Sequence, residues 1–527
     1  MTTSSMIATP SPGLKYFYPL QEPPTPRTVD ADVVVYGGTS AGIAAAIHAQ
    51  RMGKQAVLLV FGRHVGGMTT AGLGATDIGN KHAIGGLSRE FYRRLGQHYG
   101  QQEEAMTFEP SVAEQVYHQM LEEAGVAIFF EHRLQSVRMD HRRITQVTTD
   151  NGSTFRGAMF IDATYEGDLM AKAGVTYTVG REDNRVYDET FNGIQFGSPN
   201  HKFRVPVDPY RIKGDRSSGL LLGIQDVAPG QQGTGDRCVQ AYNFRLCLSS
   251  DEDNQRPFPK PLGYDPLRYE LLLRYLRAGV WDVLQLTRMM PNDKADTNNY
   301  GGFSSDNIGM NYDWPDGDYA TRERIFQDHV TYHQGMMWFL ANDPRVPDEV
   351  RQDVRGWGLP QDEFVETGGW PHELYVREGR RMVSDCVMTE HHCRHDVVVD
   401  DSVGMAAYTI DSHNCRRLVI DGSAINEGNV EEPPSAPYPI SYRAIIPRQG
   451  ECENLLVPWC LSASHTAFGS IRMEPVGMIL GQSAATAGCL ALEDNVAVQD
   501  VEYARLYDHL VRAGQVLEME VALPRSR

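Results

Sequence analysis

The sequence predicts an α/β fold in which helices cover both faces of a parallel sheet. Three observations near the N-terminus lead to this prediction: a β-branched strand over 32–36, a glycine-rich turn directly after it, and an alanine-rich helix over 41–53. A second apolar strand follows over 56–60. Continuous apolar strands joined by a helix are typical of a parallel sheet that is buried on both faces.

The glycine-rich turn lies between the first strand and the first helix, where a dinucleotide's diphosphate can bind. Gly37 permits the tight turn, Gly42 lets helix and strand approach, and the helix N-terminus offers amide donors and a positive dipole end. Thr39 stands where the usual fingerprint has its second glycine, and Val60 stands where an acid normally holds the ribose. The predicted diphosphate contacts are Gly37, Gly38, Thr39, Ser40, Ala41 and Gly42.

The rest of the N-terminal part alternates helices and short strands. Helices are expected over 87–98 and 110–125, the second with Pro110 at its start and Gly125 at its end. Short strands over 126–130, 133–139, 143–149 and 153–157, with a hairpin turn at Asp150-Asn151-Gly152, predict a β-meander inserted into the sheet domain. An apolar strand over 158–162 then resumes the parallel sheet.

The chain is expected to divide into five parts. These are an irregular proline-rich leader (1–30), the first part of the nucleotide domain (31–180), a mixed α+β substrate domain (181–400), a return to the first domain (401–495), and a C-terminal helix and tail (496–527). Helices are expected over 265–278, 319–340 and 475–490. Strands are expected near 407–410 and 455–457.

Composition excludes several classes of function. The formal charge of −19 and pI near 5.3 make nucleic acid and membrane surfaces poor partners. With no apolar run of about 18 residues and no secretory signal pattern at the N-terminus, we expect a cytoplasmic protein. Motifs of serine hydrolases and P-loop ATPases are absent from the sequence.

The eight cysteines form no Cys-x-x-Cys pair, which indicates a reducing compartment and no ordinary iron–sulfur cluster. One segment combines the residue types of a zinc site, in spacing that matches no standard zinc pattern. Its members are Cys386, His391, His392, Cys393 and His395. We therefore expect no metal.

Six stretches of the chain resemble a known family. They are GGTSAGIAAA (37–46), GLGATDIGN (72–80), GGLSREFYRRLG (85–96), IDATYEGDLMA (161–171), QAYNFRLCL (240–248) and SASHTAFGSIRMEPVGMILGQSAA (462–485). Together they are similar to FAD-dependent oxidoreductases related in fold to the heterodisulfide reductase A flavoprotein. The resemblance implies a glutathione-reductase-type FAD-binding Rossmann domain with an inserted β-meander, plus a mixed α+β substrate domain, and FAD as cofactor.

The resemblance also implies which further residues contact FAD. Gly66, Gly67 and Met68 would lie against the flavin side, and a second motif would meet the ribityl and phosphate part. The last motif begins a helix whose N-terminus would point at the flavin pyrimidine, where it stabilises negative charge. The residues are Ala163, Thr164, Gly167 and Asp168 in the second motif and Glu474, Pro475, Val476, Gly477 and Met478 in the last. Arg63 and His64 are the polar groups nearest Val60 in sequence.

Candidate catalytic residues come from the segment before the last helix. His465 is the first choice for a general base, and Arg472 is a candidate anchor for a substrate anion, with Glu474 to orient it. Tyr442 and Arg443 are further candidates on the returning segment. Each of them also fits a purely structural role in a loop or strand.

A polar cluster over 294–299 suits the hydroxyls of a sugar or polyol, or else forms a surface turn. The leading hypothesis is therefore a dehydrogenase or oxidase that takes hydride from a small polar, hydroxylated or sugar-like substrate to flavin N5. One alternative is fumarate-reductase-like reduction of an activated double bond, and another is an inactive FAD-binding protein. Because only one strand–glycine–helix unit is evident, we expect no separate nicotinamide domain, and the electron acceptor stays open.

Overall fold

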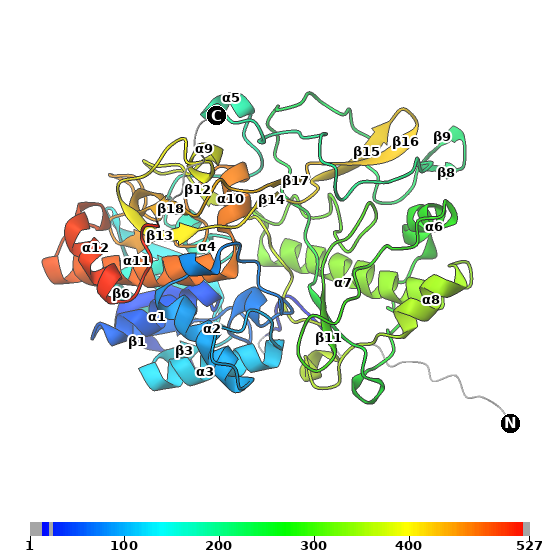
Figure 1. Ribbon diagram of the computed structural model, residues 1–527. Helices are drawn as coiled ribbons and strands as arrows, with labels where there is room; N and C mark the ends of the chain where they lie inside the picture. The colour runs from blue at the N-terminus through cyan, green and yellow to red at the C-terminus, as the bar shows by residue number, and fades with distance from the viewer. Residues whose placement is uncertain (1–12, 20–24, 520–527) are drawn as a thin grey trace.

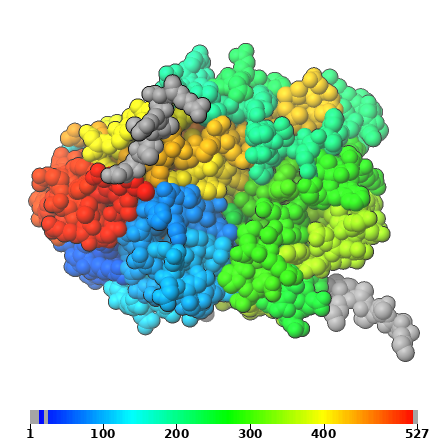
Figure 2. Space-filling view, viewed as in Figure 1, coloured from blue at the N-terminus to red at the C-terminus, as the bar shows by residue number. Residues whose placement is uncertain are grey.

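The computed structural model describes residues 13–19 and 25–519. Most of the leader predicted over 1–30 lies outside these ranges. In Figure 1 the nucleotide-binding elements form the left half of the molecule and the long helices of the substrate part form the right half. Figure 2 shows the two halves in contact along their length.

A seven-stranded sheet organises the left half of the described chain, in the order β3-β2-β1-β6-β5-β4, with β19 pairing beside β6. Strands β3, β2, β1, β6 and β19 run parallel to one another, which confirms the predicted α/β fold with a parallel sheet. The bounds are β1 Thr28–Tyr36, β2 Ala56–Leu59, β3 Ala127–Phe129, β4 Leu134–Asp140, β5 Arg143–Thr149, β6 Thr154–Asp162 and β19 Leu455–Leu456.

Two strand assignments made from sequence were wrong. The strand expected over 126–130 as part of the meander is β3, which pairs in parallel with β2. The strands expected over 153–157 and 158–162 are one strand, β6, whose first residues pair antiparallel with β5 while its whole length pairs in parallel with β1. The hairpin turn at Asp150-Asn151-Gly152 is confirmed, and Gly152 takes φ +82° there.

Helices that contact one another pack against the sheet. Helices α1 (Ser40–Arg51), α2 (Gly86–His98), α3 (Pro110–Ala124) and α11 (Glu474–Asp494) confirm the predicted helices. Helix α11 is the one described helix long and apolar enough to cross a membrane, and 94% of its most apolar window is buried inside the protein. It packs along α1, and α12 (Tyr503–Arg512) contacts its outer side.

The substrate part is built on helices α6 (Glu270–Arg277), α7 (Tyr319–Asn342) and α8 (Asp348–Arg355), together with two-stranded ladders. The ladders used below are β10 (Leu246–Ser249) with β11 (Lys294–Thr297), β13 (Ser402–Ala406) with β18 (Tyr438–Ser441), β14 (Ile410–Ser412) with β17 (Val430–Glu432), and β15 (Arg416–Ile420) with β16 (Ser423–Glu427). The strand expected near 407–410 was wrong: this segment is the connection between β13 and β14. Its backbone at Ala407 packs closely on Gly79 instead of pairing in a ladder.

The segment after residue 400 serves both halves. Strand β19 and helix α11 join the main sheet and its helices, whereas β15 and β16 lie over the substrate part (Figure 1). The backbones of Arg417 and Ala424 hydrogen-bond with Gln225 and Val207 there. The two halves are therefore interleaved.

Candidate cofactor and substrate site

A cavity opens at the carboxyl ends of β1 and β2, where α/β folds bind their ligands. Most of its lining comes from five stretches of chain: residues 15–18, the turn after β1, the turn after β2, the segment after β6, and residues 372–376. Glu131, Arg133, Trp314, Phe326, Glu366 and Thr367 complete it. The predicted contacts that line it are Gly37, Gly38, Thr39, Arg63, His64, Gly67, Thr164 and Asp168. The structure thus brings eight of the predicted residues together.

The glycine-rich turn holds its shape through Thr39. The Thr39 hydroxyl donates to the Ala163 carbonyl at 2.7 Å and accepts from the Gly42 amide at 3.3 Å, so it caps α1. Gly37 has φ +116°, and a Cβ on Gly42 would lie 1.9 Å from the Gly37 carbonyl oxygen. Thr39 therefore replaces the second glycine by tying the turn to the end of β6.

Tyr165 joins the turn after β2 to the start of α11. The Tyr165 hydroxyl accepts from the Met68 amide and donates to Glu474, both at 2.8 Å. A Cβ on Gly67 would lie 2.0 Å from that hydroxyl, so glycine is required there. His64 is oriented by Glu114, with 3.0 Å between Nδ1 and Oε1, and stacks on His372 with 3.9 Å between ring centres.

Glu474 begins α11 as a buried carboxyl with three hydroxyl donors. Ser40, Thr69 and Tyr165 donate to it at 2.5, 3.1 and 2.8 Å. Burial raises its pKa to about 7, and the three hydrogen bonds oppose that shift. Glu474 therefore joins the start of α11 to α1, and it does not line the cavity; nor do Pro475, Val476, Gly477 and Met478.

Asp168 lines the cavity, but its carboxylate accepts hydrogen bonds from two arginines. Arg322 donates to both oxygens at 2.6 and 2.8 Å, and Arg380 adds a third bond at 2.8 Å. Burial alone would raise the pKa of Asp168, yet the two arginines outweigh it and hold the pKa below its ordinary value. The sequence predicted a direct ligand contact, whereas the structure gives Asp168 two protein partners.

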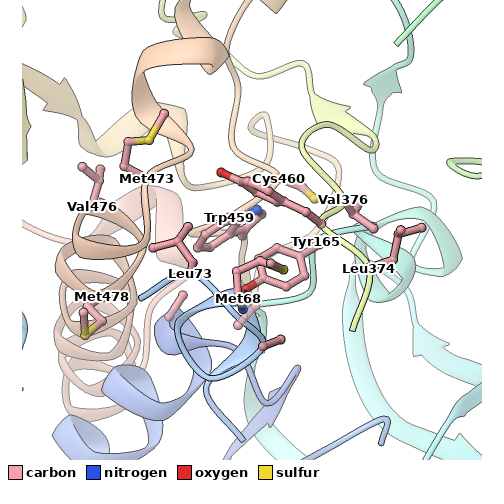
Figure 3. Close-up of a cluster of buried hydrophobic side chains, with 14 of the residues drawn as sticks. Met68, Leu73, Tyr165, Leu374, Val376, Trp459, Cys460, Met473, Val476 and Met478 are labelled. Carbon is pink, nitrogen blue, oxygen red and sulfur yellow. Dashed lines mark hydrogen bonds between the residues drawn. The ribbon is translucent and has the colours of Figure 1, made fainter. Parts of the chain in front are cut away.

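An apolar cluster continues from the cavity toward α11. Figure 3 shows Met68, Leu73, Tyr165, Leu374, Val376, Trp459, Met473 and Val476 gathered from the turn after β2, the segment after β6, residues 374–376, the 457–460 segment and the start of α11. Leu374, Val376 and Tyr165 belong to both the cluster and the cavity lining. Such a surface suits a flat aromatic ring at this end of the site.

A family model for FAD-dependent oxidoreductases matches residues 32–510, which is most of the chain. The chain is an FAD-dependent oxidoreductase. The match includes the glycine turn, the segment after β6 and the start of α11. Enzyme class and cofactor are thereby established together.

Several solved flavoenzyme structures align with part of this oxidoreductase. L-amino acid deaminase from Proteus vulgaris has 16% identity and a TM-score of 0.25, with 32% of this chain and 55% of that chain covered. p-Nitrophenol 4-monooxygenase from Pseudomonas putida has 14% identity and a TM-score of 0.22, with 31% and 50% covered. The 3-ketosteroid-Δ4-(5α)-dehydrogenase from Rhodococcus jostii has 16% identity and a TM-score of 0.20, with 28% of this chain and 50% of that chain covered. The matched region spans about half of each solved chain, and no curated protein matches.

The residues at the site fit FAD. The N-terminus of α1 and the glycine turn face the cavity with amide donors suited to a diphosphate. The apolar cluster offers a surface for the isoalloxazine, and Thr164 stands between these two regions. When bound, FAD supplies a hydride acceptor at N5.

The segment before α11 places Arg472 in a buried ionic network. Arg472 donates to the Tyr375 hydroxyl at 2.8 Å and to the Asp411 backbone and carboxylate at 2.9 and 3.2 Å. Arg245 and Arg377 also lie over the Tyr375 ring. All three guanidinium groups are buried, and each retains a nitrogen without a hydrogen-bond partner among the described residues.

His465 is held by two neighbours at the start of α10 (His465–Ile471). Its Nδ1 lies 2.9 Å from both oxygens of Glu378, and its Nε2 lies 2.9 Å from the Ser412 hydroxyl. The side chain is buried and does not line the cavity. Because Ser412 lies between Asp411 and His413, His465 contacts the opposite face of β14 from these two residues.

Tyr442 and Arg443 are not brought to the cavity. The Tyr442 hydroxyl donates to the Val498 carbonyl at 2.6 Å. Arg443 is 48% exposed and pairs with Asp400 and Asp401. Both contacts have the structural roles that the sequence also allowed.

His413 and Asp306 were missed from sequence. His413 Nδ1 lies 2.8 Å from Asp306 and its Nε2 lies 3.4 Å from Asp411, so it joins the network of Arg472 and Arg377. The polar run Asp411-Ser412-His413-Asn414 is the one signal that could have indicated it. A histidine far from a known motif cannot be paired with its carboxylate before the fold is known.

The 294–299 cluster reaches the same network and is not a surface turn. Residues 294–297 form the buried strand β11, where Asp296 accepts two bonds from Arg245 at 2.8 and 2.6 Å. Asn298 accepts from Arg377 at 2.9 Å. The hydroxyl-binding interpretation stays a prediction, and its location is now beside Tyr375.

The cysteine and histidine segment over 386–395 forms ordinary hydrogen bonds. His391 and His395 contact the carbonyls of Asp188 and Pro437, and His392 completes the cap of a short helix with Thr389. In the ranges that the structure describes, no group of three or more potential ligands could hold a metal.

Proposed function

We propose that this FAD-dependent oxidoreductase removes a hydride from a carbon that bears a hydroxyl group, in a small polar, sugar-like substrate. The observation that carries the proposal is the buried network around Tyr375, with arginine donors and aspartate acceptors in alternation. Paired donors and acceptors of this kind suit vicinal hydroxyls, which both donate and accept hydrogen bonds. An apolar substrate would offer no acceptor to the guanidinium nitrogens that lack a hydrogen-bond partner among the described residues.

The network lies next to the predicted flavin surface. Leu374 and Val376 line the cavity, while Tyr375 and Arg377 between and after them contact the network. Arg472 is two residues before Glu474, the first residue of α11. Substrate held by Tyr375 and Arg472 would therefore stand beside the ring-binding end of the site.

Two carboxylates of the network are partly exposed. The side chains of Asp77 and Asp411 are 29% and 22% exposed, whereas Arg472 and Arg377 are buried. Tyr408 donates to Asp77 at 3.0 Å and so fixes one wall of this approach. A small polar substrate would enter between Asp77 and Asp411.

His413 is the proton acceptor in this proposal. Asp306 lies 2.8 Å from Nδ1 and orients the ring, while Asp411 lies 3.4 Å from Nε2; the substrate hydroxyl would displace Asp411 from Nε2, so that Nε2 can accept its proton. The hydroxyl proton of the substrate passes to Nε2 as the carbonyl forms, and Asp306 stabilises the resulting charge. In this proposal His465 has an indirect role: it contacts the Ser412 hydroxyl and so orients β14.

Anaerobic bleaching of the flavin by a panel of polyols, aldoses and hydroxy acids tests the proposal. We expect His413→Gln to slow bleaching by roughly 10²–10⁴-fold while flavin content is retained. His465→Gln serves as the matched variant and is expected to have the smaller effect. Bleaching of His413→Gln at the wild-type rate would exclude His413 as the base.

Reduction of an activated double bond is the second candidate function. The three guanidinium groups around Tyr375 favour it, because each could donate to a substrate carboxylate. Aspartates 77, 296, 306 and 411 offset that positive charge, which is why we place this candidate second. Rapid reoxidation of the chemically reduced enzyme by enoates, without bleaching by any alcohol, would favour this function over the first.

We also propose a glutathione-reductase-type arrangement of the heterodisulfide reductase A kind, in a cytoplasmic protein with no nucleic-acid or membrane partner. The order of strands in the main sheet and the charge of −19 support these assignments. Fractionation of the native host cell, with flavin absorbance as the marker, tests the location.

A further inference from the structure

The end of β2 provides no carboxylate for the ribose of the adenosine half of FAD. Val60 is buried, and a Cβ on Gly38 would lie 2.8 Å from its side chain. The Val60 side chain therefore packs under the glycine turn and presents only methyl groups to the cavity. In a dinucleotide site, the ribose hydroxyls at this place need an acceptor.

Glu131 stands beside this gap from the neighbouring strand. It follows β3 by two residues, and its amide donates to the Gly62 carbonyl at 2.9 Å, while the next amide, of His132, donates to the Val60 carbonyl at 3.0 Å. These two bonds fix Glu131 against the end of β2. Its side chain lines the same cavity as Gly38 and Val60.

Among the described residues, one of the two oxygens of the Glu131 carboxylate has a hydrogen-bond partner. Arg63 Nε donates to Oε1 at 3.1 Å, and the Arg63 guanidinium lies 4.2 Å from the centre of the Tyr18 ring. No hydrogen bond is recorded for Oε2 within residues 13–19 and 25–519. The side chain is 32% exposed, so this oxygen is available to a ligand in the cavity.

We infer that Glu131 accepts the adenosine ribose hydroxyls of FAD in place of the acid that β2 lacks, and that Arg63 positions its carboxylate. A carboxylate that follows β3 can reach the ribose as well as one at the end of β2 would, because the carboxyl ends of the parallel strands β2 and β3 meet at one edge of the sheet. The inference rests on the family's cofactor, and it is independent of the substrate proposed above.

Glu131→Gln tests the inference through flavin binding. We expect the FAD dissociation constant of the flavin-depleted protein to rise about 10–100-fold, and the holoprotein to release FAD at a lower temperature on heating. Flavin fluorescence reports both. Glu103→Gln is the control: Glu103 is 77% exposed, pairs with Lys81 and does not line the cavity, so its loss is expected to leave FAD affinity unchanged.

Two further measurements separate a ribose contact from a structural effect. FMN lacks the adenosine ribose, so Glu131→Gln is expected to leave FMN affinity unchanged. The double variant Val60→Glu with Glu131→Gln returns an acid to β2 and is expected to regain FAD affinity. Wild-type FAD binding by Glu131→Gln, or an equal loss for FAD and FMN, would overturn the inference; neither outcome depends on turnover.

Discussion

Thr39 shows how one side chain substitutes for a missing glycine. Its hydroxyl caps α1 and at the same time bonds the end of β6, so the turn keeps its shape without the second glycine of the fingerprint. The sequence showed that Thr39 departs from the usual dinucleotide-binding fingerprint. The compensating bond spans 124 residues, from Thr39 to Ala163, and could be seen only in the folded chain.

Glu373 is a second residue whose character depends on its surroundings. It lines the cavity in the substrate part, and burial together with the charges of Glu166 and Glu474 raises its pKa from 4.5 to about 8. Between pH 4.5 and about pH 8, Glu373 keeps its proton in the folded chain but has lost it in the unfolded chain. Stability therefore falls as pH rises from about 4.5 to about 8 and is level above that.

Glu373→Gln should remove this dependence. We expect the flavin-free variant to be more stable than the wild type by roughly 1–3 kcal/mol at about pH 8.5, with little difference near pH 4.5. Urea unfolding across this range measures it. Glu366→Gln, at an exposed carboxyl, is the control, and parallel curves for Glu373→Gln and wild type would contradict the prediction.

At the scale of elements, the contact between α1 and α11 positions the site. A Cβ on Gly481 would lie 2.1 Å from the Ala41 carbonyl oxygen, so the helices approach at the level of their backbones. Because α1 begins at the glycine turn and α11 begins at Glu474, this contact fixes the two helix N-termini relative to each other. The pairing of the two helices joins segments more than 400 residues apart, so it is visible only in the folded chain.

Gly481→Ala tests that packing. The added methyl group meets backbone, which cannot move without displacing α1, so we expect a loss of about 1–3 kcal/mol in unfolding free energy and weaker FAD retention. Gly488→Ala in the same helix meets its nearest atom, Leu456 Cδ1, at 3.4 Å. It should be neutral or stabilising by about 0.5–1 kcal/mol. Equal effects of the two substitutions would refute the packing argument.

At the scale of the whole molecule, the last quarter of the chain completes the first domain. Strand β19 pairs with β6, and α11 covers α1 and β6. A chain without them exposes one side of β6 and the apolar face of α1 to water. Folding of the nucleotide site is therefore coupled to residues more than 400 positions away from the glycine turn.

A fragment that ends at residue 400 should not retain FAD. The reason is the loss of β19 and α11 from the core of the sheet domain, which leaves α1 without its packing partner. Co-expression with residues 401–527 is expected to restore a soluble, yellow complex. A soluble 1–400 fragment that binds FAD by itself would show that the returning segment is dispensable.

The sequence by itself determined the parallel α/β sheet, the glycine turn at the N-terminus of α1, and the FAD-dependent class. The sheet and the turn depend on local patterns, namely apolar strands and glycines with fixed spacing, whereas the FAD-dependent class depends on the resemblance of six stretches of the chain to a known family. Element bounds were accurate where caps such as Pro110 and Gly125 mark them. The strand over 126–130 was assigned to the wrong partner and the strand near 407–410 was misplaced, because strand partners are not encoded locally.

The tertiary structure alone decided the composition of the candidate site. It separated Tyr442 and Arg443 from the cavity, gave Asp168 to two arginines, and joined His413 to Asp306 across 107 residues. It also placed Glu131 beside Val60. The physical reason is that a charged or hydrogen-bonding side chain acquires its role from the partner it meets, and these partners come from distant segments that only folding brings together.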